Sequence, residues 1–106
     1  MSSLYEHKVL QYLKNYLVVA EKVKEIILRL DPKAKVYVFG SVVRGDYIAS
    51  SDIDILVITS DIKLKYDLIV AVYKEIDAPV ELHIVTQELF EKWYKKFIKS
   101  EEIVEV

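Results

Sequence analysis

The stretch VFGSVVRGDYIASSDIDILV, residues 38–57, holds both glycines of the chain, Gly40 and Gly45. It begins inside KVYVFG (35–40), whose β-branched and aromatic residues end at a glycine, a pattern typical of a strand. SDIDILVIT (51–59) predicts a second strand, because apolar and polar residues alternate at its start. The stretch therefore predicts two strands joined by a turn in which the chain uses all of its glycine.

The first glycine begins a turn suited to binding phosphate. A strand that ends in Gly40-Ser41 and continues into a short turn of helix brings backbone N–H groups and a hydroxyl close to an anion. Gly45 lets the chain turn back after that helical turn. Arg44 lies between them, where it would neutralise a phosphate or brace the loop by pairing with a carboxylate.

Asp52 and Asp54 form the second chemical feature of the stretch. Residues two apart in a strand point to the same face, so the carboxylates would lie roughly 6–7 Å apart with the isoleucines on the other face. Such a pair suits Mg²⁺ or Mn²⁺, which take oxygen ligands. The alternative is that Asp-x-Asp only marks the exposed start of an edge strand. Ser51 is expected mainly to shape the turn before the pair.

The remaining residues predict an α/β (α+β) domain with a small mixed sheet of three to four strands and helices packed on one face. Apolar residues recur at helical spacing from Leu4 to Leu30, and Asp31-Pro32 ends that helix. The other predicted elements are a helix over 61–76 that Ser60 caps, a strand over 80–85, a helix over 87–99 with Thr86 as N-cap, and a short edge strand in the tail EEIVEV.

Length and composition limit the function. At 106 residues we expect one domain, 1–106, with an N-terminal helix (1–30) and a core (35–99). The net charge of −2 leaves no extended surface for nucleic acid, and the absence of cysteine excludes disulfides. Without a long apolar segment or cleavage signature, we expect a cytoplasmic protein that does not contact membranes.

Taken together, Gly-Ser-x-x-Arg-Gly followed by Ser-Asp-x-Asp resembles the signature of the nucleotidyltransferase superfamily of the DNA polymerase β type. In motif, length and element order the chain resembles the minimal nucleotidyltransferases of archaea and bacteria. That resemblance implies a metal-dependent transferase that moves a nucleoside monophosphate from an NTP to a hydroxyl and releases pyrophosphate. It also assigns Gly40, Ser41, Arg44, Gly45 and Ser51 to the nucleotide.

The family uses a third carboxylate on a neighbouring strand, and Glu81 in APVELHIV matches that position, where Asp is commoner. Asp77 is the competitor, although it falls in the preceding turn. The resemblance implies that Asp52, Asp54 and Glu81 are catalytic and hold two Mg²⁺ ions, with Mn²⁺ as a substitute. His83, on the face of Glu81, would line the acceptor site or be an ordinary strand histidine. Tyr47 would stack on a base or only cover the site.

The resemblance also implies a partner. Minimal nucleotidyltransferases commonly pair with a helical HEPN protein, and such pairs often act as toxin and antitoxin, the transferase adding AMP from ATP to a tyrosine of its partner. A 27-residue N-terminal helix would be about 40 Å long and could seat that partner or a second copy, unless it breaks near Asn15 and folds back. The alternatives are a binding module that neutralises its partner by contact, and a transferase acting on a small molecule or an RNA end.

Overall fold

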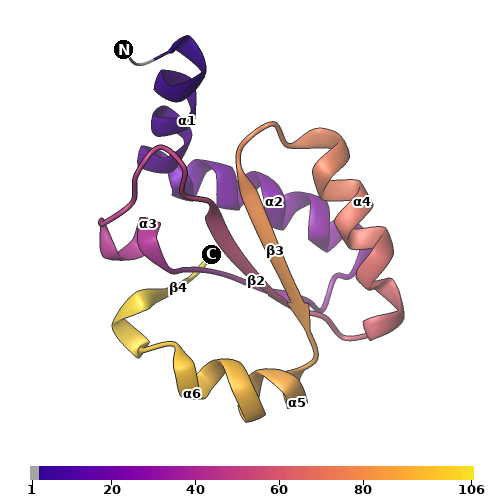
Figure 1. The fold of residues 1–106 in the computed structure, drawn as a ribbon. Helices are drawn as coiled ribbons and strands as arrows, with labels where there is room; N and C mark the ends of the chain where they lie inside the picture. The colour runs from indigo at the N-terminus through magenta and orange to yellow at the C-terminus, as the bar shows by residue number, and fades with distance from the viewer. Residues whose placement is uncertain (1–2) are drawn as a thin grey trace.

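The protein is built around one four-stranded mixed sheet, as the computed structural model, which describes residues 3–106, shows (Figure 1). The sheet order is β3-β2-β1-β4. Strand β1 pairs antiparallel with β2 and with β4, whereas β2 and β3 are parallel. The strands are β1 (Lys35–Phe39), β2 (Ile53–Ile58), β3 (Val80–Val85) and β4 (Ile103–Glu105). All four predicted strands, including the one in the tail, are confirmed.

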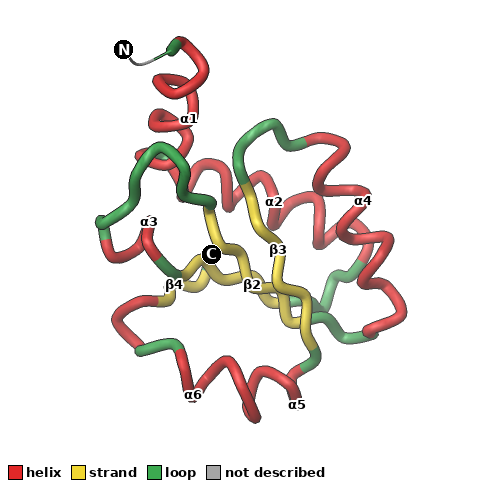
Figure 2. Tube along the Cα trace, viewed as in Figure 1, coloured by secondary structure: helices red, strands yellow, loops and turns green. Residues whose placement is uncertain are grey.

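The helices lie before, between and after these strands (Figure 2). Because β2 and β3 are parallel, a crossover must join them, and α4 supplies it. The helices are α1 (Leu4–Lys14), α2 (Tyr16–Leu30), α3 (Ser41–Arg44), the 3₁₀ turn η1 (Ile62–Leu64), α4 (Lys65–Glu75), α5 (Gln87–Leu89), the π-helical η2 (Phe90–Tyr94), α6 (Lys95–Phe97) and the 3₁₀ turn η3 (Ser100–Glu102).

Helices α2 and α4 cover one face of the sheet and form the main core. Alternate strand residues point to this face, since the side-chain period of a strand is two. The fully buried members of this core are Leu13, Ala20, Val23, Ile27, Val36, Val38, Ile53, Ile55, Val57, Leu68 and Val72.

The opposite face is covered only in part, by the C-terminal helical segment (87–97). Phe90 and Tyr94 from this segment pack on a smaller cluster that includes buried Leu56, Ile58 and Val85. The mixed-sheet α/β class is therefore confirmed, and the expectation of helices on one face is extended by this second, partial layer. The polar half of the same face stays open, and it carries the candidate site.

Of the two alternatives for residues 4–30, one long helix and a helix that breaks near Asn15, the structure shows the break. Asn15 leaves helical geometry (φ −104°, ψ 37°), and its side-chain amide donates to the Gln11 carbonyl at 2.9 Å. Asparagine competes for backbone hydrogen bonds in this way, which makes it a weak helix former. The break turns Val9 and Leu13 of α1 into the core, while Leu4, at the far end, is 90% exposed. Figure 1 shows α1 projecting away from the sheet.

The end of α2 is fixed by a buried carboxylate, Asp31. It accepts hydrogen bonds from the hydroxyl of Thr59 (2.6 Å) and from the hydroxyl (2.7 Å) and N–H (2.8 Å) of Ser60. Burial by itself raises the pKa of Asp31, but these hydrogen bonds outweigh it and leave the pKa below its usual value. The prediction that Ser60 caps the next helix is therefore wrong. Asp61 caps the following turn, because its side chain accepts a hydrogen bond from the N–H of Lys63 at 3.0 Å.

The predicted cap of the last helix is confirmed, since the Thr86 hydroxyl accepts from the N–H of Leu89 at 3.2 Å. Over residues 3–106, no helix combines the length and the apolar character needed to cross a membrane.

Candidate active site

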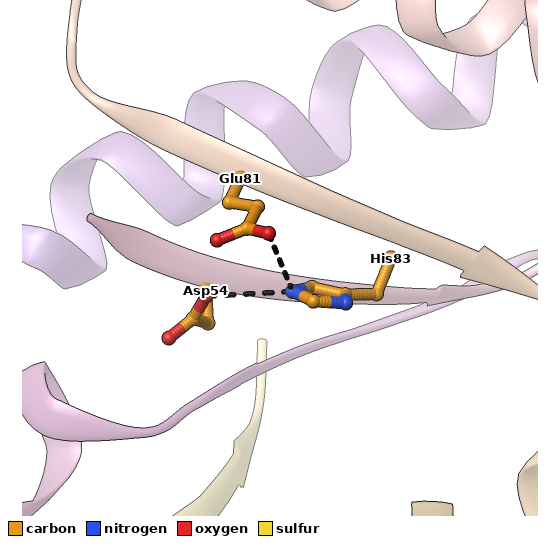
Figure 3. A group of neighbouring side chains, drawn as sticks. All are labelled: Asp54, Glu81 and His83. Atoms are coloured by element: carbon orange, nitrogen blue, oxygen red, sulfur yellow. Dashed lines mark hydrogen bonds and ion pairs between the residues drawn. The ribbon is translucent and has the colours of Figure 1, made fainter.

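Two neighbouring strands bring Asp54, Glu81 and His83 together on the open face of the sheet (Figure 3). Asp54 of β2 lies in register with Glu81 of β3, and paired residues of parallel strands point to the same side. His83 Nε2 lies 3.4 Å from Asp54 Oδ1 and 3.9 Å from Glu81 Oε1. One donor atom of each residue lies within 4.8 Å of the other two, which is close enough for one metal ion to bridge all three.

Neighbouring rings hold the imidazole of His83 in place. The edges of Phe39 and Tyr94 meet it at centroid distances of 5.1 and 6.1 Å, at angles of 63° and 71°. Asp54 and His83 are each three-quarters buried, whereas the Glu81 side chain is 56% exposed. The geometry therefore combines two oriented, partly buried donors with one carboxylate that solvent and substrate can reach.

Gly40 approaches this site so closely that no other residue fits. Its backbone has φ +86° and ψ −150°, a region essentially restricted to glycine. A Cβ at this position would lie 2.6 Å from Asp54 Oδ2. The glycine thus gives the Asp54 carboxylate the space it occupies, a reason that the sequence pattern alone did not provide.

Gly45 ends the short helix α3, and its backbone lies in the left-handed region (φ +86°, ψ 9°). Its N–H donates to the Ser41 carbonyl at 2.8 Å. Arg44 braces the loop, with its Nε 3.2 Å from Asp46 Oδ2 and its Nη1 3.8 Å from Glu102 Oε2. Of the two roles weighed for Arg44, the contacts support bracing, although the residue also lines the pocket described below.

The other predicted residues lie around this centre. Asp52 is exposed, immediately before β2, and is not part of the group of three. The Ser51 hydroxyl accepts from the N–H of Ile48 at 2.9 Å, as expected of a residue that shapes the turn. Asp77 is exposed in the turn before β3 and also outside the group. Tyr47 packs against the main core.

A pocket of about 840 Å³ opens beside the group of three. Gly40, Ser41, Arg44, Asp54 and His83 line one part of it. The C-terminal segment supplies the other part, with Leu89, Trp93, Tyr94, Phe97 and Ile98. The regular helix predicted over 87–99 did not indicate that Trp93 and Phe97 border the site. The periodicity carried no signal for this, because it assumed a regular α-helix.

The turn at Gly40-Ser41, the carboxylates on adjacent strands and the pocket beside them are features suited to a site that handles a nucleotide. The family model of the nucleotidyltransferase domain matches residues 20–106. The chain therefore belongs to the nucleotidyltransferase domain family, and it is an enzyme of that class, which transfers a nucleoside monophosphate.

Two solved structures agree. The chain is 27% identical to one from Sulfolobus solfataricus, with a TM-score of 0.59, over 99% of this chain and 87% of that one. It is 31% identical to a second, with a TM-score of 0.65, over 81% of this chain and 95% of that one. Both are described as a "putative nucleotidyltransferase". No curated protein matches the chain significantly.

Proposed function

We propose that the protein transfers AMP from ATP to a hydroxyl group of a protein partner, as the antitoxin-like half of a pair with a HEPN-type protein. The observation that carries the transfer is the group of Asp54, Glu81 and His83, of which Asp54 and His83 line one pocket together with the turn Gly40-Ser41. AMP, the protein acceptor and the pairing come from the resemblance to minimal nucleotidyltransferases.

The donor atoms of the site fit a divalent cation. Carboxylate oxygens suit both Mg²⁺ and Mn²⁺, whereas an imidazole nitrogen suits Mn²⁺, a transition metal, better than Mg²⁺. Asp54 and Glu81 would hold the ion, with His83 as a third donor and Asp52 as a further carboxylate for a second ion. When bound, the metal would neutralise charge on the phosphates and make the acceptor hydroxyl more acidic.

The other residues of the site bind and orient the substrate. Ser41 and the backbone of Gly40 would hold the β- and γ-phosphates, so that the acceptor attacks the α-phosphorus in line with the departing pyrophosphate. Arg44, held by Asp46 and Glu102, keeps this loop in place. Glu81 is exposed enough to take the proton of an incoming hydroxyl.

A protein acceptor agrees with one feature of the surface. The helices α1 and α2 expose Leu4 and Tyr5 at the start of α1, and Leu17 and Val18 just after the break at Asn15. These apolar side chains would contact the partner or a second copy of the chain.

The test measures transfer and neutralisation with the same variants. The protein, α-³²P-labelled ATP, Mg²⁺ and a HEPN-type protein as candidate partner are incubated, and label on the partner is measured. Asp54→Asn should abolish labelling and protection from the toxin. Asp77→Asn, an exposed acid outside the site, is the matched control and should retain both.

Two results would contradict the proposal. Protection that survives Asp54→Asn would support neutralisation by contact. Labelling of RNA ends or small molecules, without labelling of the partner, would support the remaining alternative.

A further inference from the structure

We propose that Trp93 and Phe97, with Leu89 beside them, form the subsite that stacks on the base of the nucleoside triphosphate. This inference rests on the proposed function for its ligand. It goes further by assigning the base to the C-terminal helical segment instead of to the loop at Tyr47.

The first argument is continuity. The pocket of about 840 Å³ is lined by the phosphate turn, Asp54 and His83 at one part and by these three apolar side chains at the other. Its volume falls in the range of about 300–1,000 Å³ that is usual for small-molecule sites. A nucleotide whose phosphates lie at Gly40 and Ser41 therefore has space for its sugar and base within the same pocket.

The second argument is the exposure of large aromatic rings. Trp93 is 57% exposed and Phe97 is 74% exposed, yet their rings stack on each other at a centroid distance of 6.4 Å and an angle of 17°. They form an apolar wall of the pocket that the described chain leaves more than half exposed. Every base offers a π-face to such a wall, which is how many proteins hold unpaired bases.

The third argument is the backbone that presents this wall. Residues Phe90–Tyr94 form a π-helix, in which the Lys95 N–H donates to the Phe90 carbonyl five residues earlier. Single π-turns inside helices are frequent at functional sites. Phe90 packs on the sheet, Trp93 and Phe97 border the pocket, and Tyr94 does both.

Few polar groups near the wall could read the edge of a base. Of the charged side chains that line the pocket, Arg44 and Glu102 are paired with each other. Recognition by stacking alone depends on ring area, so we expect purine nucleotides to bind more tightly than pyrimidine nucleotides, with little difference between ATP and GTP.

The chain contains a single tryptophan, so its fluorescence reports on this wall directly. The protein is titrated with ATP, GTP, UTP and inorganic tripolyphosphate in the presence of Mg²⁺, while calorimetry measures total binding. The nucleotides should quench Trp93, and tripolyphosphate, which has no base, should bind without quenching.

The matched variants are Phe97→Ala and Tyr66→Ala, which remove aromatic rings of equal exposure (74%), the second in a different surface pocket. Phe97→Ala should weaken ATP binding about tenfold or more and leave tripolyphosphate binding unchanged. Tyr66→Ala should change neither. Thermal unfolding checks that both variants are folded.

The outcomes separate the two proposals. If ATP binds without quenching Trp93 fluorescence, and Phe97→Ala does not change the ATP affinity, the base subsite is wrong and the proposed function stands. If Phe97→Ala weakens only the binding of the partner protein, the wall is a protein contact, which also overturns the inference. If calorimetry detects no nucleotide binding at all, both proposals fail.

Discussion

Replacing Gly40 with alanine tests whether the packing of Asp54 against the glycine positions the active site. The added Cβ would lie 2.6 Å from Asp54 Oδ2, whereas ordinary van der Waals contact begins at 3.4 Å. The backbone at Gly40 also has a conformation that L-residues rarely adopt, so alanine is strained there in addition to the contact. The Asp54 carboxylate must therefore be displaced by about 0.8 Å.

Two effects of different size follow. The backbone strain should lower the free energy of unfolding by about 1–3 kcal/mol. A misplacement near 1 Å in an active site can cost about 10²-fold in rate, so nucleotidyl transfer should fall by about that factor. Mn²⁺ binding should weaken too, because Asp54 is one of the proposed ligands.

Gly45→Ala is the matched control. Gly45 has the same φ of +86°, but a Cβ there would meet nothing within 4 Å. It should cost about 1–2 kcal/mol in stability, with transfer and Mn²⁺ binding close to wild type. Urea denaturation gives the stability, electron paramagnetic resonance of free Mn²⁺ gives the metal affinity, and the labelling assay gives the rate.

Two patterns would refute this reasoning. A folded Gly40→Ala protein with full activity and Mn²⁺ affinity would mean that Asp54 is not a working part of the site. Equal losses of activity in both variants would mean that the loop backbone matters and the contact with Asp54 does not.

Three further predictions concern other parts of the chain. Asp31→Asn should lower the free energy of unfolding at pH 7 by about 2 kcal/mol, because it removes a charged acceptor of several hydrogen bonds. Burial raises the pKa of Asp31, but the hydrogen bonds outweigh burial and hold the pKa below its ordinary value of 3.8. The stability that the carboxylate contributes is therefore fully present above pH 3.8 and is lost as the pH falls through the folded pKa. The free energies of unfolding at pH 3 and pH 7 should therefore differ less in the variant than in the wild type. An equal difference in the two proteins would contradict this role of Asp31. His83→Gln should weaken Mn²⁺ binding about tenfold and Mg²⁺ binding much less; calorimetry would contradict a ligand role if both ions were affected equally. Leu13→Ala, at a fully buried position, should cost about 2–5 kcal/mol, whereas Leu10→Ala, at a position 37% exposed, should cost less than about 1 kcal/mol; equal costs in urea denaturation would mean that α1 does not pack on the core as described.

The strands were predictable because their signal is local. The alternation of Ile53, Ile55 and Val57 fixes which face is buried, and so also places Asp54 on the other face. Glu81 was chosen from the family resemblance, which calls for a third carboxylate on a neighbouring strand, and the register of β2 with β3 pairs it with Asp54. Roles for these residues, and for Asp52 and Ser51 in particular, stay predictions.

What the sequence did not reveal depends on contacts between distant segments or on irregular backbone. The break at Asn15 was only one of two alternatives, because the apolar spacing continues across it. The hydrogen bonds of Asp31 to Thr59 and Ser60 join positions 28 and 29 residues apart. The position of Trp93 could not be derived from a helical wheel, since the wheel assumes a constant rotation per residue.

That irregular turn has a consequence for how the enzyme could change. A π-turn closes its hydrogen bond over one residue more than an α-turn, and one residue corresponds to a rotation of about 100°. Deletion of a single residue between Phe90 and Lys95 would therefore turn Trp93 or Phe97 away from the pocket while Phe90 stayed anchored on the sheet. In relatives of this chain, insertions and deletions at this point could alter the choice of nucleotide without any substitution among the metal-binding residues.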